Sequence, residues 1–279
     1  MNNVKQLQDI ATQVRRDIIR MIFASQSGHP GGSLGCADFM TVLYFNVMNA
    51  SPQTFTIDGK AQDMFFLSNG HIAPVWYSVL ARAGYFDVKE LGTLRKLHSK
   101  LQGHPTTYTE GVRIASGSLG QGLSVACGAA LAKKMNNDTN LVFTLHGDGE
   151  LQEGQIWEAA MFAAAKKIDN LIATVDYNGQ QIDGSVDNVL SLGDLAAKFT
   201  AFGWEVIQLN GNDIQALTDG FAKAKSLAGK GKPVVILMKT EMGQGVDFMM
   251  GSHKWHGKAP NEEQTQQALS QLPETLGDY

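Results

Sequence analysis

Residues 145–184, LHGDGELQEGQIWEAAMFAAAKKIDNLIATVDYNGQQIDG, decide how this chain folds. They predict a strand at 141–145 that enters a Gly-Asp-Gly turn, a helix from about 151 to 167, and a second strand at 170–176. A strand, a helix and a strand in this order form a right-handed crossover between parallel neighbours. The stretch therefore predicts a parallel sheet with helices packed against it.

The loops that follow these two strands carry polar residues suited to a ligand. Asp148 follows the first strand and Asn178 the second, so both are expected at the sheet edge where open α/β proteins bind ligands. The glycines beside Asp148 let the backbone approach a ligand closely, and the start of the following helix favours an anion. One carboxylate and one amide oxygen suit Mg²⁺ shared with phosphates. An ordinary tight turn and a turn-forming asparagine are the alternative, which the pairing of the two turns disfavours.

The remaining segments continue the alternation of helices and strands. Helices are expected at 3–25, 36–48, 75–83, 88–98, 123–134, 190–201 and 214–227 and after Asn261, and strands at 64–68, 204–209 and 233–240. The glycine-rich segment 25–35 is expected to be a loop. This order predicts an α/β fold with a three-layer, doubly wound and mostly parallel sheet. No linker divides residues 1–279, so a single domain is expected.

Composition describes a globular protein and argues against several classes of partner. The 279 residues are 43% hydrophobic and 18% charged with a net charge of −4, so neither nucleic acid nor an anionic membrane is an expected partner. No apolar run approaches the roughly 20 residues of a membrane span, and the charged amphipathic N-terminus fits no signal peptide, so a cytoplasmic protein is expected. Cys36 and Cys127 lack metal-ligand or disulfide spacing and are expected in the core.

Four of the seven histidines lie in separate loops rich in glycine or proline. These four are His29, His71, His104 and His256. Imidazoles donate and accept protons near neutral pH, so the four loops form a candidate catalytic site. His98 matches no motif and is interpreted as a surface residue, and His146 is interpreted as the end of its strand in preference to a cofactor contact. His253 and His256 have a spacing that could bind zinc on a helix, but their proline and glycine flanks and the lack of a third ligand disfavour it.

Residues 115–122, ASGSLGQG, form a further glycine-rich segment before a helix of small residues. Their order is G-x-x-G-x-G, not the G-x-G-x-x-G order of a dinucleotide site, and no acidic residue closes a strand at the required distance. A nicotinamide-dependent protein is therefore a disfavoured alternative.

The Gly-Asp-Gly turn, followed about thirty residues later by an asparagine after a hydrophobic strand, resembles the thiamine diphosphate (ThDP) signature. The detail GDGELQEGQIWEA with DYNGQQIDG resembles the transketolase family, and so do SGHPGGSLGCAD, LSNGH, GHP and the HG-x-P segment at His256. Two positions depart from the family pattern. Gln180 stands where isoleucine is usual, which matters little if its backbone oxygen is the ligand. Ser118 stands where proline is usual, which leaves that loop less rigid.

The resemblance implies a set of site residues. Mg²⁺, or Ca²⁺ or Mn²⁺ in its place, would be held against the ThDP diphosphate by Asp148, the Asn178 side chain and the backbone carbonyl of Gln180. Cofactor contacts are expected from His71, Gly117, Leu119, Asp148, Gly149, Glu153, Asn178, Ile182 and His256. Leu119 and Ile182 would face the thiazolium ring. Glu153 would lie at the dimer contact between active sites, although a favourable interaction with the helix dipole is the simpler interpretation of that residue alone.

The same resemblance assigns roles to the four loop histidines. His104 would contact the terminal hydroxyl of a donor ketose, and His29 and His256 the acceptor side. His71 would lie near the diphosphate and the reacting carbon.

The resemblance extends over nearly the whole chain but only to the diphosphate-binding domain, because complete transketolases are more than twice as long. It implies the N-terminal subunit of a split transketolase, which transfers a two-carbon ketol group from a ketose phosphate to an aldose phosphate, as in the pentose phosphate pathway. A separate C-terminal subunit would supply the pyrimidine-binding domain and its activating glutamate, in an α2β2 assembly. The alternatives are a non-catalytic ThDP-binding regulatory module and another ThDP enzyme, such as a 1-deoxyxylulose-phosphate synthase or a 2-oxo acid decarboxylase.

Overall fold

The computed structural model describes residues 2–279 and has a parallel sheet of five strands in the order β1-β2-β3-β7-β6. The strands are β1 (Met64–Leu67), β2 (Val142–Gly147), β3 (Leu171–Tyr177), β6 (Glu205–Asn210) and β7 (Val234–Lys239). Each expected strand is present within one or two residues of its expected bounds. A two-stranded antiparallel hairpin, β4 (Gln180–Gln181) and β5 (Gly184–Ser185), follows β3 and was not expected.

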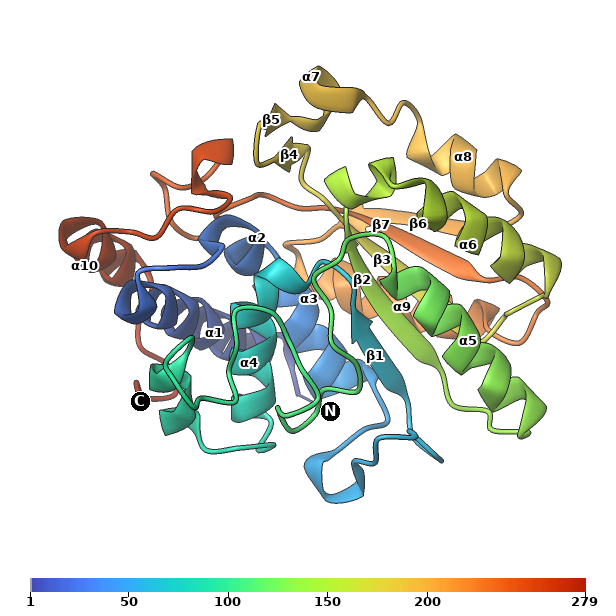
Figure 1. Cartoon of the computed structure of the whole chain (residues 1–279), viewed down its shortest axis with the longest axis horizontal. Helices are drawn as coiled ribbons and strands as arrows, with labels where there is room; N and C mark the ends of the chain where they lie inside the picture. Colours follow the sequence, from blue (N-terminus) through green and yellow to red (C-terminus); the bar gives the residue numbers. More distant parts are fainter. Residues whose placement is uncertain (1) are drawn as a thin grey trace.

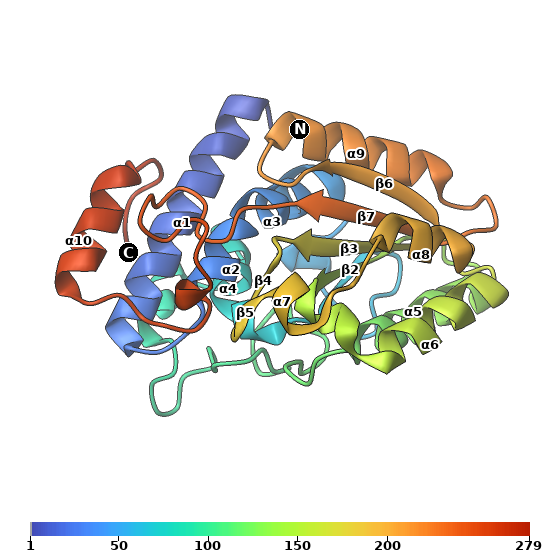
Figure 2. The same ribbon diagram turned by 90° about the horizontal axis from the view of Figure 1, so that it is seen from above.

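Helices cover both faces of the sheet, as Figures 1 and 2 show. They are α1 (Val4–Ser25), α2 (Pro30–Gly35), α3 (Ala37–Val42), α4 (Ala73–Arg82), α5 (Gly122–Met135), α6 (Gly154–Ala165), α7 (Val186–Leu190), α8 (Leu195–Ala201), α9 (Ile214–Leu227) and α10 (Glu262–Gln271). α1 begins at a capping box in which Asn3 and Gln6 satisfy each other's backbone N–H groups. The three-layer α/β prediction is confirmed.

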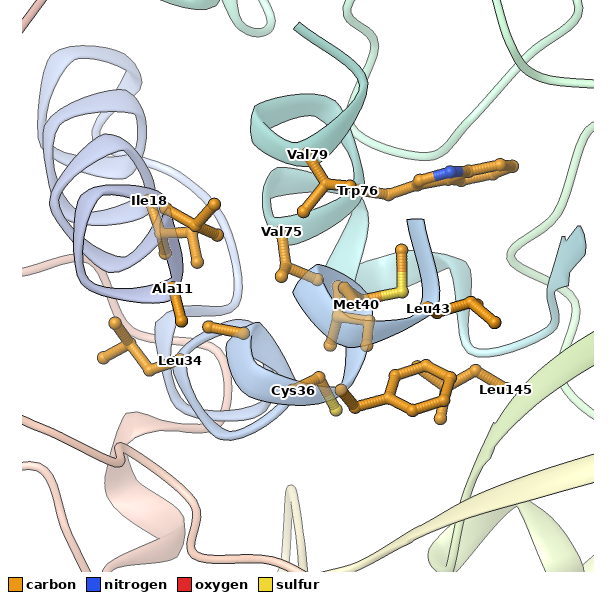
Figure 3. Packing of buried hydrophobic residues seen from close by; sticks show 14 of the residues in the cluster. Ala11, Ile18, Leu34, Cys36, Met40, Leu43, Val75, Trp76, Val79 and Leu145 are labelled. Atoms are coloured by element: carbon orange, nitrogen blue, oxygen red, sulfur yellow. The ribbon is translucent and has the colours of Figure 1, made fainter. Parts of the chain in front are cut away.

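Alternating side chains of the strands build a separate core on each face of the sheet. Phe65 and Leu67 of β1 join the core beneath α1, α3, α4 and α9, whereas Phe66 joins the core beneath α5, α6 and α8. Figure 3 shows Ile18 of α1 and Val75 of α4 within the first of these cores. Full burial of an aliphatic side chain of this size contributes about 1.5–3 kcal/mol, so these two cores hold the sheet in place.

The segment expected as a loop at 25–35 contains a helix, α2, and that prediction was wrong. Pro30 occupies the first turn, where its fixed φ suits a helix start and its missing N–H costs nothing. The following glycines pack against other parts of the chain, because a Cβ at Gly35 would lie 2.9 Å from the Glu241 carbonyl oxygen. Tertiary packing thus overrides the low helix propensity of glycine.

Other boundaries differ in smaller ways. The helix expected at 151–167 is preceded by a 3-10 turn (Gly149–Gln152), so α6 begins later, and the helix expected at 36–48 ends in a π turn (Leu43–Val47). Only a 3-10 segment (Val88–Thr93) forms within the helix expected at 88–98. The helix expected at 190–201 begins only at Leu195 as α8, where Asp194 caps its start, and a separate short helix, α7, precedes it.

Both cysteines are buried and unpaired, as expected. Within residues 2–279, the structure has no helix with the length and apolar character needed to cross a membrane.

Candidate active site

A cavity of about 450 Å³ lies at the carboxyl ends of β1, β2 and β3. Its lining comes from loops far apart in the sequence and includes His29, Asn69, His71, His104, Gly117, Leu119, Gly149, Glu150, Gln152, Glu153, Asn178, Gln180, Gln181, Ile182, Met242 and His256, together with Asp148 and Asp176. Every residue expected to contact the cofactor, the metal or the substrate is in this set. A volume of this size is typical of small-molecule sites.

Strand register brings the two polar loops together. Gly147, the last residue of β2, pairs with Asp176 near the end of β3, so the turns that follow lie level. The carboxylate of Asp148 accepts hydrogen bonds from the backbone N–H of Gly149 at 2.8 Å and of Gly179 at 2.5 Å. Asp148 therefore joins the loop after β2 to the loop that carries Asn178.

Asn178 is held by Asp176, a residue that the sequence motifs did not indicate. Its Nδ2 donates to Asp176 Oδ2 at 2.9 Å, and its Oδ1 accepts from the backbone N–H of Gln180 at 2.8 Å. The Thr240 hydroxyl donates to the other oxygen of Asp176. An aspartate inside a buried strand was the available signal, since such a carboxylate needs polar partners.

Two buried acids meet at this edge, and no lysine or arginine is among the residues that line the cavity. Burial and the nearby Asp176 carboxylate raise the pKa of Asp148 to about 7, and burial raises the pKa of Asp176. A divalent cation at this edge would stabilise the ionised forms. In residues 2–279, no three His, Cys, Asp or Glu side chains are grouped to hold a metal ion. The donors here are instead one carboxylate, one amide and backbone oxygens, which fit Mg²⁺ better than Zn²⁺.

Three of the four loop histidines form a tight group over the cavity. The ring centroids of His29 and His71 lie 4.9 Å apart, those of His71 and His256 5.2 Å, and those of His29 and His256 5.7 Å. His104 lies against Gly117, where a Cβ would come within 2.7 Å of the imidazole. The φ of +139° at Gly117 also requires glycine, so the loop can pass the ring only because that residue has no side chain.

These imidazoles are neutral over the physiological pH range. Burial, with a smaller contribution from neighbouring imidazoles, lowers the pKa of His29 to about 4 and that of His71 to about 3. Burial also lowers the pKa of His104 and His256. The Nδ1 atoms of His29 and His256 are buried and have no hydrogen-bond partner among residues 2–279. Such atoms are available to the hydroxyl and carbonyl groups of a ligand.

The two apolar residues expected beside the cofactor line the cavity and come from different loops. Leu119 comes from the loop before α5, and Ile182 from the turn between β4 and β5. Ile182 is 61% exposed. Asn69 also lines the cavity, and its buried Oδ1 has no partner. Asn69 was missed because an Asn-Gly pair ordinarily indicates only a turn.

Glu153 is the N-cap residue of α6, but its side chain makes no capping hydrogen bond. It is exposed at the rim of the cavity. The histidines interpreted as bystanders lie apart from the cavity lining. His98 is exposed, and His146 is a buried residue of β2 whose Nε2 lies 2.8 Å from the Thr144 hydroxyl.

This arrangement is that of an open parallel α/β protein with a ligand cavity at the carboxyl edge of its sheet. Residues 7–274 match the model of the family described as transketolase, thiamine diphosphate binding domain. The chain is 36% identical over 262 residues to one of the subunits of an apulose-4-phosphate transketolase from Phocaeicola vulgatus, with 94% of this chain and 92% of the relative covered. It is 38% identical over 267 residues to a 6-deoxy-6-sulfo-D-fructose transketolase subunit of a Clostridium species, with 95% and 96% covered.

A solved structure has the same fold. The transketolase of Campylobacter jejuni superposes with a TM-score of 0.89 at 35% identity, over 97% of this chain and 43% of that chain. The chain therefore spans less than half the length of that transketolase. It belongs to the transketolase family and is a transketolase-type transferase subunit that comprises the ThDP-binding domain.

Proposed function

We propose that this chain is the N-terminal subunit of a ThDP- and Mg²⁺-dependent split transketolase, which transfers a two-carbon ketol group from a ketose to an aldose. The single observation that carries this proposal is the junction of the Asp148 and Asn178 loops beneath a group of neutral histidines. The match to separate subunits over almost their full length supports a two-chain enzyme.

Asp148, the Asn178 side chain and the Gln180 backbone carbonyl would hold Mg²⁺ against the cofactor diphosphate. When bound, ThDP supplies the nucleophilic carbon that carries the two-carbon unit. Leu119 and Ile182 would enclose its ring and exclude water. Gly117 and Gly149 would let the backbone approach it, and Glu153 would face the neighbouring subunit.

The histidines would transfer protons and form hydrogen bonds with substrate hydroxyl groups. Because His29 and His71 stay neutral near pH 7, each has one nitrogen that accepts a proton and one that donates. His104 would bind the terminal hydroxyl of the donor ketose, and His29 with His256 the hydroxyl and carbonyl of the acceptor. His71 would orient the reacting carbon near the diphosphate.

The substrate would be a sugar with an anionic end, by analogy with the two relatives, whose names specify apulose 4-phosphate and 6-deoxy-6-sulfofructose. No Lys or Arg is among the residues that line the cavity. The phosphate or sulfonate would therefore be bound by basic side chains of the partner chain. Which ketose and aldose are used would depend on that partner.

The partner would cover an apolar surface formed by α5 and α6. Val125 and Met135 of α5 are 38% and 77% exposed, and Met161 and Phe162 of α6 are 58% and 40% exposed. Gly128 lies on the same exposed side of α5, and a Cβ there would meet nothing within 4 Å. A surface of this kind beside a cavity suits a stable contact between chains, which an α2β2 assembly would provide.

The test combines the chain with a C-terminal transketolase subunit from the same organism, and measures ThDP-dependent ketol transfer from a panel of phosphorylated and sulfonated ketoses. Activity of the mixture with none in either chain alone is expected. Full activity of this chain alone would contradict the need for a partner. Binding of ThDP without transfer in the mixture would instead favour a non-catalytic module, and decarboxylation of a 2-oxo acid would favour another ThDP enzyme.

A pair of variants tests the contact surface. Gly128→Trp should leave the isolated chain folded and prevent assembly, as size-exclusion chromatography would show. Ala222→Trp, on the exposed side of α9, is the matched control and should assemble normally.

A further inference from the structure

Glu150 lies in the 3-10 turn between β2 and α6 and is 2% exposed. Both of its carboxylate oxygens have donors. Oε1 accepts from the Ser68 hydroxyl and from the Gly120 backbone N–H at 2.8 Å, and Oε2 accepts from the Gly147 backbone N–H at 3.1 Å. The Ser68 hydroxyl oxygen in turn accepts from the Gly122 backbone N–H at 3.1 Å. One buried carboxylate is thus bonded to three separate segments.

Each of these segments leads directly to residues of the cavity. Ser68 follows β1 and precedes Asn69 and His71, whereas Gly120 ends the loop that contains Gly117 and Leu119. Gly147 immediately precedes Asp148. Glu150 itself also reaches the cavity wall. The Ser68 N–H already donates to the Leu145 carbonyl of β2 at 2.9 Å, so the carboxylate ties the loop before α5 to the carboxyl ends of β1 and β2.

The ionised carboxylate is the form that accepts all of these bonds. Burial acts to raise the pKa of Glu150, but the His146 imidazole and the donors Ser68 and Gly120 outweigh it and lower the pKa below its usual value. His146 Nδ1 lies 3.7 Å from Glu150 Oε1, too far for a direct hydrogen bond. Glu150 lies in the GDGELQEGQIWEA segment, but none of the expected metal, cofactor or substrate contacts involves it.

We propose that Glu150 is a positioning residue, which locks the loops after β1, after β2 and before α5 into the arrangement that receives the ThDP diphosphate. The inference rests on the proposed function, since it takes the cavity to be the ThDP site. A residue of this kind touches neither the substrate nor the reacting carbon and acts through the loops that it joins.

Glu150→Gln is the nearly isosteric test. A glutamine oxygen can still accept from Ser68 and Gly120, but its NH₂ group then faces the Gly147 N–H, so one donor loses its acceptor. Ser68→Ala keeps the negative charge and removes the two bonds of the Ser68 hydroxyl, to Glu150 and from Gly122. It therefore separates loop positioning from any effect of the charge on the diphosphate. Glu263→Gln, on the exposed side of α10, is the matched control.

The first measurement is hydrogen exchange of the isolated chain without ligand. In Glu150→Gln, segments 115–122 and 144–149 should exchange at least about tenfold faster, while the strand β7 and helix α9 remain unchanged. Ser68→Ala should accelerate only 115–122. Unchanged exchange at 115–122, or an equal acceleration throughout the chain, would overturn the proposal.

The second measurement is calorimetric titration of ThDP with Mg²⁺ into the chain combined with its partner subunit. Glu150→Gln should weaken ThDP binding about tenfold, and Ser68→Ala by a smaller factor. Faster exchange with wild-type affinity would also overturn the proposal. If the wild-type complex binds no ThDP, the proposed function fails, and the exchange data still decide whether Glu150 fixes the loops.

Discussion

The two ends of the sheet each carry a cavity, and the larger one is at the end without the site. At the amino ends of β1 and β2 a cavity of about 750 Å³ is lined by Lys60, Lys133, Asp138 and neighbouring residues. The cavity of about 450 Å³ at the carboxyl ends is lined by the histidines and the two buried aspartates. Both contain buried charged groups, so neither volume nor the presence of charge tells them apart.

The difference lies in how well the polar groups are satisfied. At the amino end, Lys133 Nζ donates to the Gly59 carbonyl at 2.8 Å, the Gln62 carbonyl at 2.9 Å and Asp138 at 2.8 Å. Burial opposes ionisation of Asp138, but hydrogen bonds from Lys133 and Asn140 hold its pKa well below its usual range. All three hydrogens of the Lys133 ammonium group have acceptors within the protein, so this buried charge needs no ligand.

At the carboxyl end, several groups lack what they require. Asp148 has a raised pKa, and the Nδ1 atoms of His29 and His256 and the Oδ1 of Asn69 are buried without a partner. Unsatisfied groups in a concave site are costly to the fold unless a ligand completes them. Of the residues that line the two cavities, only those at the carboxyl end include buried side-chain atoms without a partner, so unsatisfied polar atoms distinguish these two cavities where size does not. The substitutions below test this contrast.

Asp148→Asn should have the largest effect. It removes the one negative charge expected to bind Mg²⁺ directly, so ThDP with Mg²⁺ should bind at least about 1000-fold more weakly, equivalent to about 4 kcal/mol. Calorimetry with the chain combined with its partner would measure the change. Stability of the ligand-free variant should change little, because relief of the repulsion by Asp176 offsets the loss of the acceptor for the Gly149 or the Gly179 N–H.

The matched substitution at the other end is Asp138→Asn. It should leave ThDP binding unchanged and lower the free energy of unfolding by about 2 kcal/mol, because Lys133 loses an ionised partner. Weaker ThDP binding in Asp138→Asn would show that the two ends are not functionally separate.

Lys133→Met should have the next largest effect, on stability alone. The variant leaves Asp138 and two carbonyl oxygens without their donor, so the free energy of unfolding in urea should fall by about 3 kcal/mol. Lys60→Met is the control, since Lys60 lines the same cavity but is exposed. Equal stability of the two variants would mean that the hydrogen bonds of the Lys133 ammonium group make no net contribution to the free energy of unfolding.

The sequence could predict the carboxyl-end site because its parts follow strand ends. The hydrophobic runs and the turn residues that follow them predict β2 and β3. Parallel pairing of these strands then brings Asp148 and Asn178 together. The sequence could not reveal Asp176 or Glu150, since their importance depends on donors such as Thr240 and Ser68 that are distant along the chain. The α2 helix and the β4–β5 hairpin were missed for a related reason: their local residues favour loops, and only packing makes them regular.

The pH dependence of stability tests whether His71 is buried and neutral in the folded chain. Unfolded His71 has a pKa near the ordinary 6.5 and folded His71 near 3, so between these values only the unfolded state binds the proton. Stability should therefore fall as the pH is lowered from 6.5 towards 4, by up to about 1.4 kcal/mol per pH unit for this residue. Asp148 acts with the opposite sign, because its folded pKa of about 7 is raised.

Asp148 is present in both wild type and His71→Asn, so its contribution cancels when the stabilities of the two proteins are compared. Urea unfolding of both proteins at a series of pH values, without metal or cofactor, gives the difference in free energy at each pH. The difference should change steadily between pH 6.5 and 4.5 and be constant above pH 7.5. A difference independent of pH would mean that His71 is accessible to protons in the folded chain.

The smallest expected effect concerns Glu153, which occupies a helix N-cap without capping it. Glu153→Gln should change the free energy of unfolding of the isolated chain by less than about 0.5 kcal/mol, because an exposed carboxylate with no hydrogen bond contributes little. Asp213→Ala is the informative contrast. The Asp213 side chain accepts from the backbone N–H groups of Gln215 at 2.9 Å and Ala216 at 3.0 Å, so its loss should cost about 1 kcal/mol.

If Glu153 acts across the contact between chains, its substitution should be silent in the isolated chain and appear only after assembly, as weaker ThDP binding or slower ketol transfer. Asp213→Ala should show the reverse, a less stable chain with normal assembly and binding. A loss of stability in isolated Glu153→Gln as large as that in Asp213→Ala would assign Glu153 to the helix dipole. The carboxyl end of the sheet would then hold one more satisfied group, and the contrast with the amino end would be correspondingly weaker.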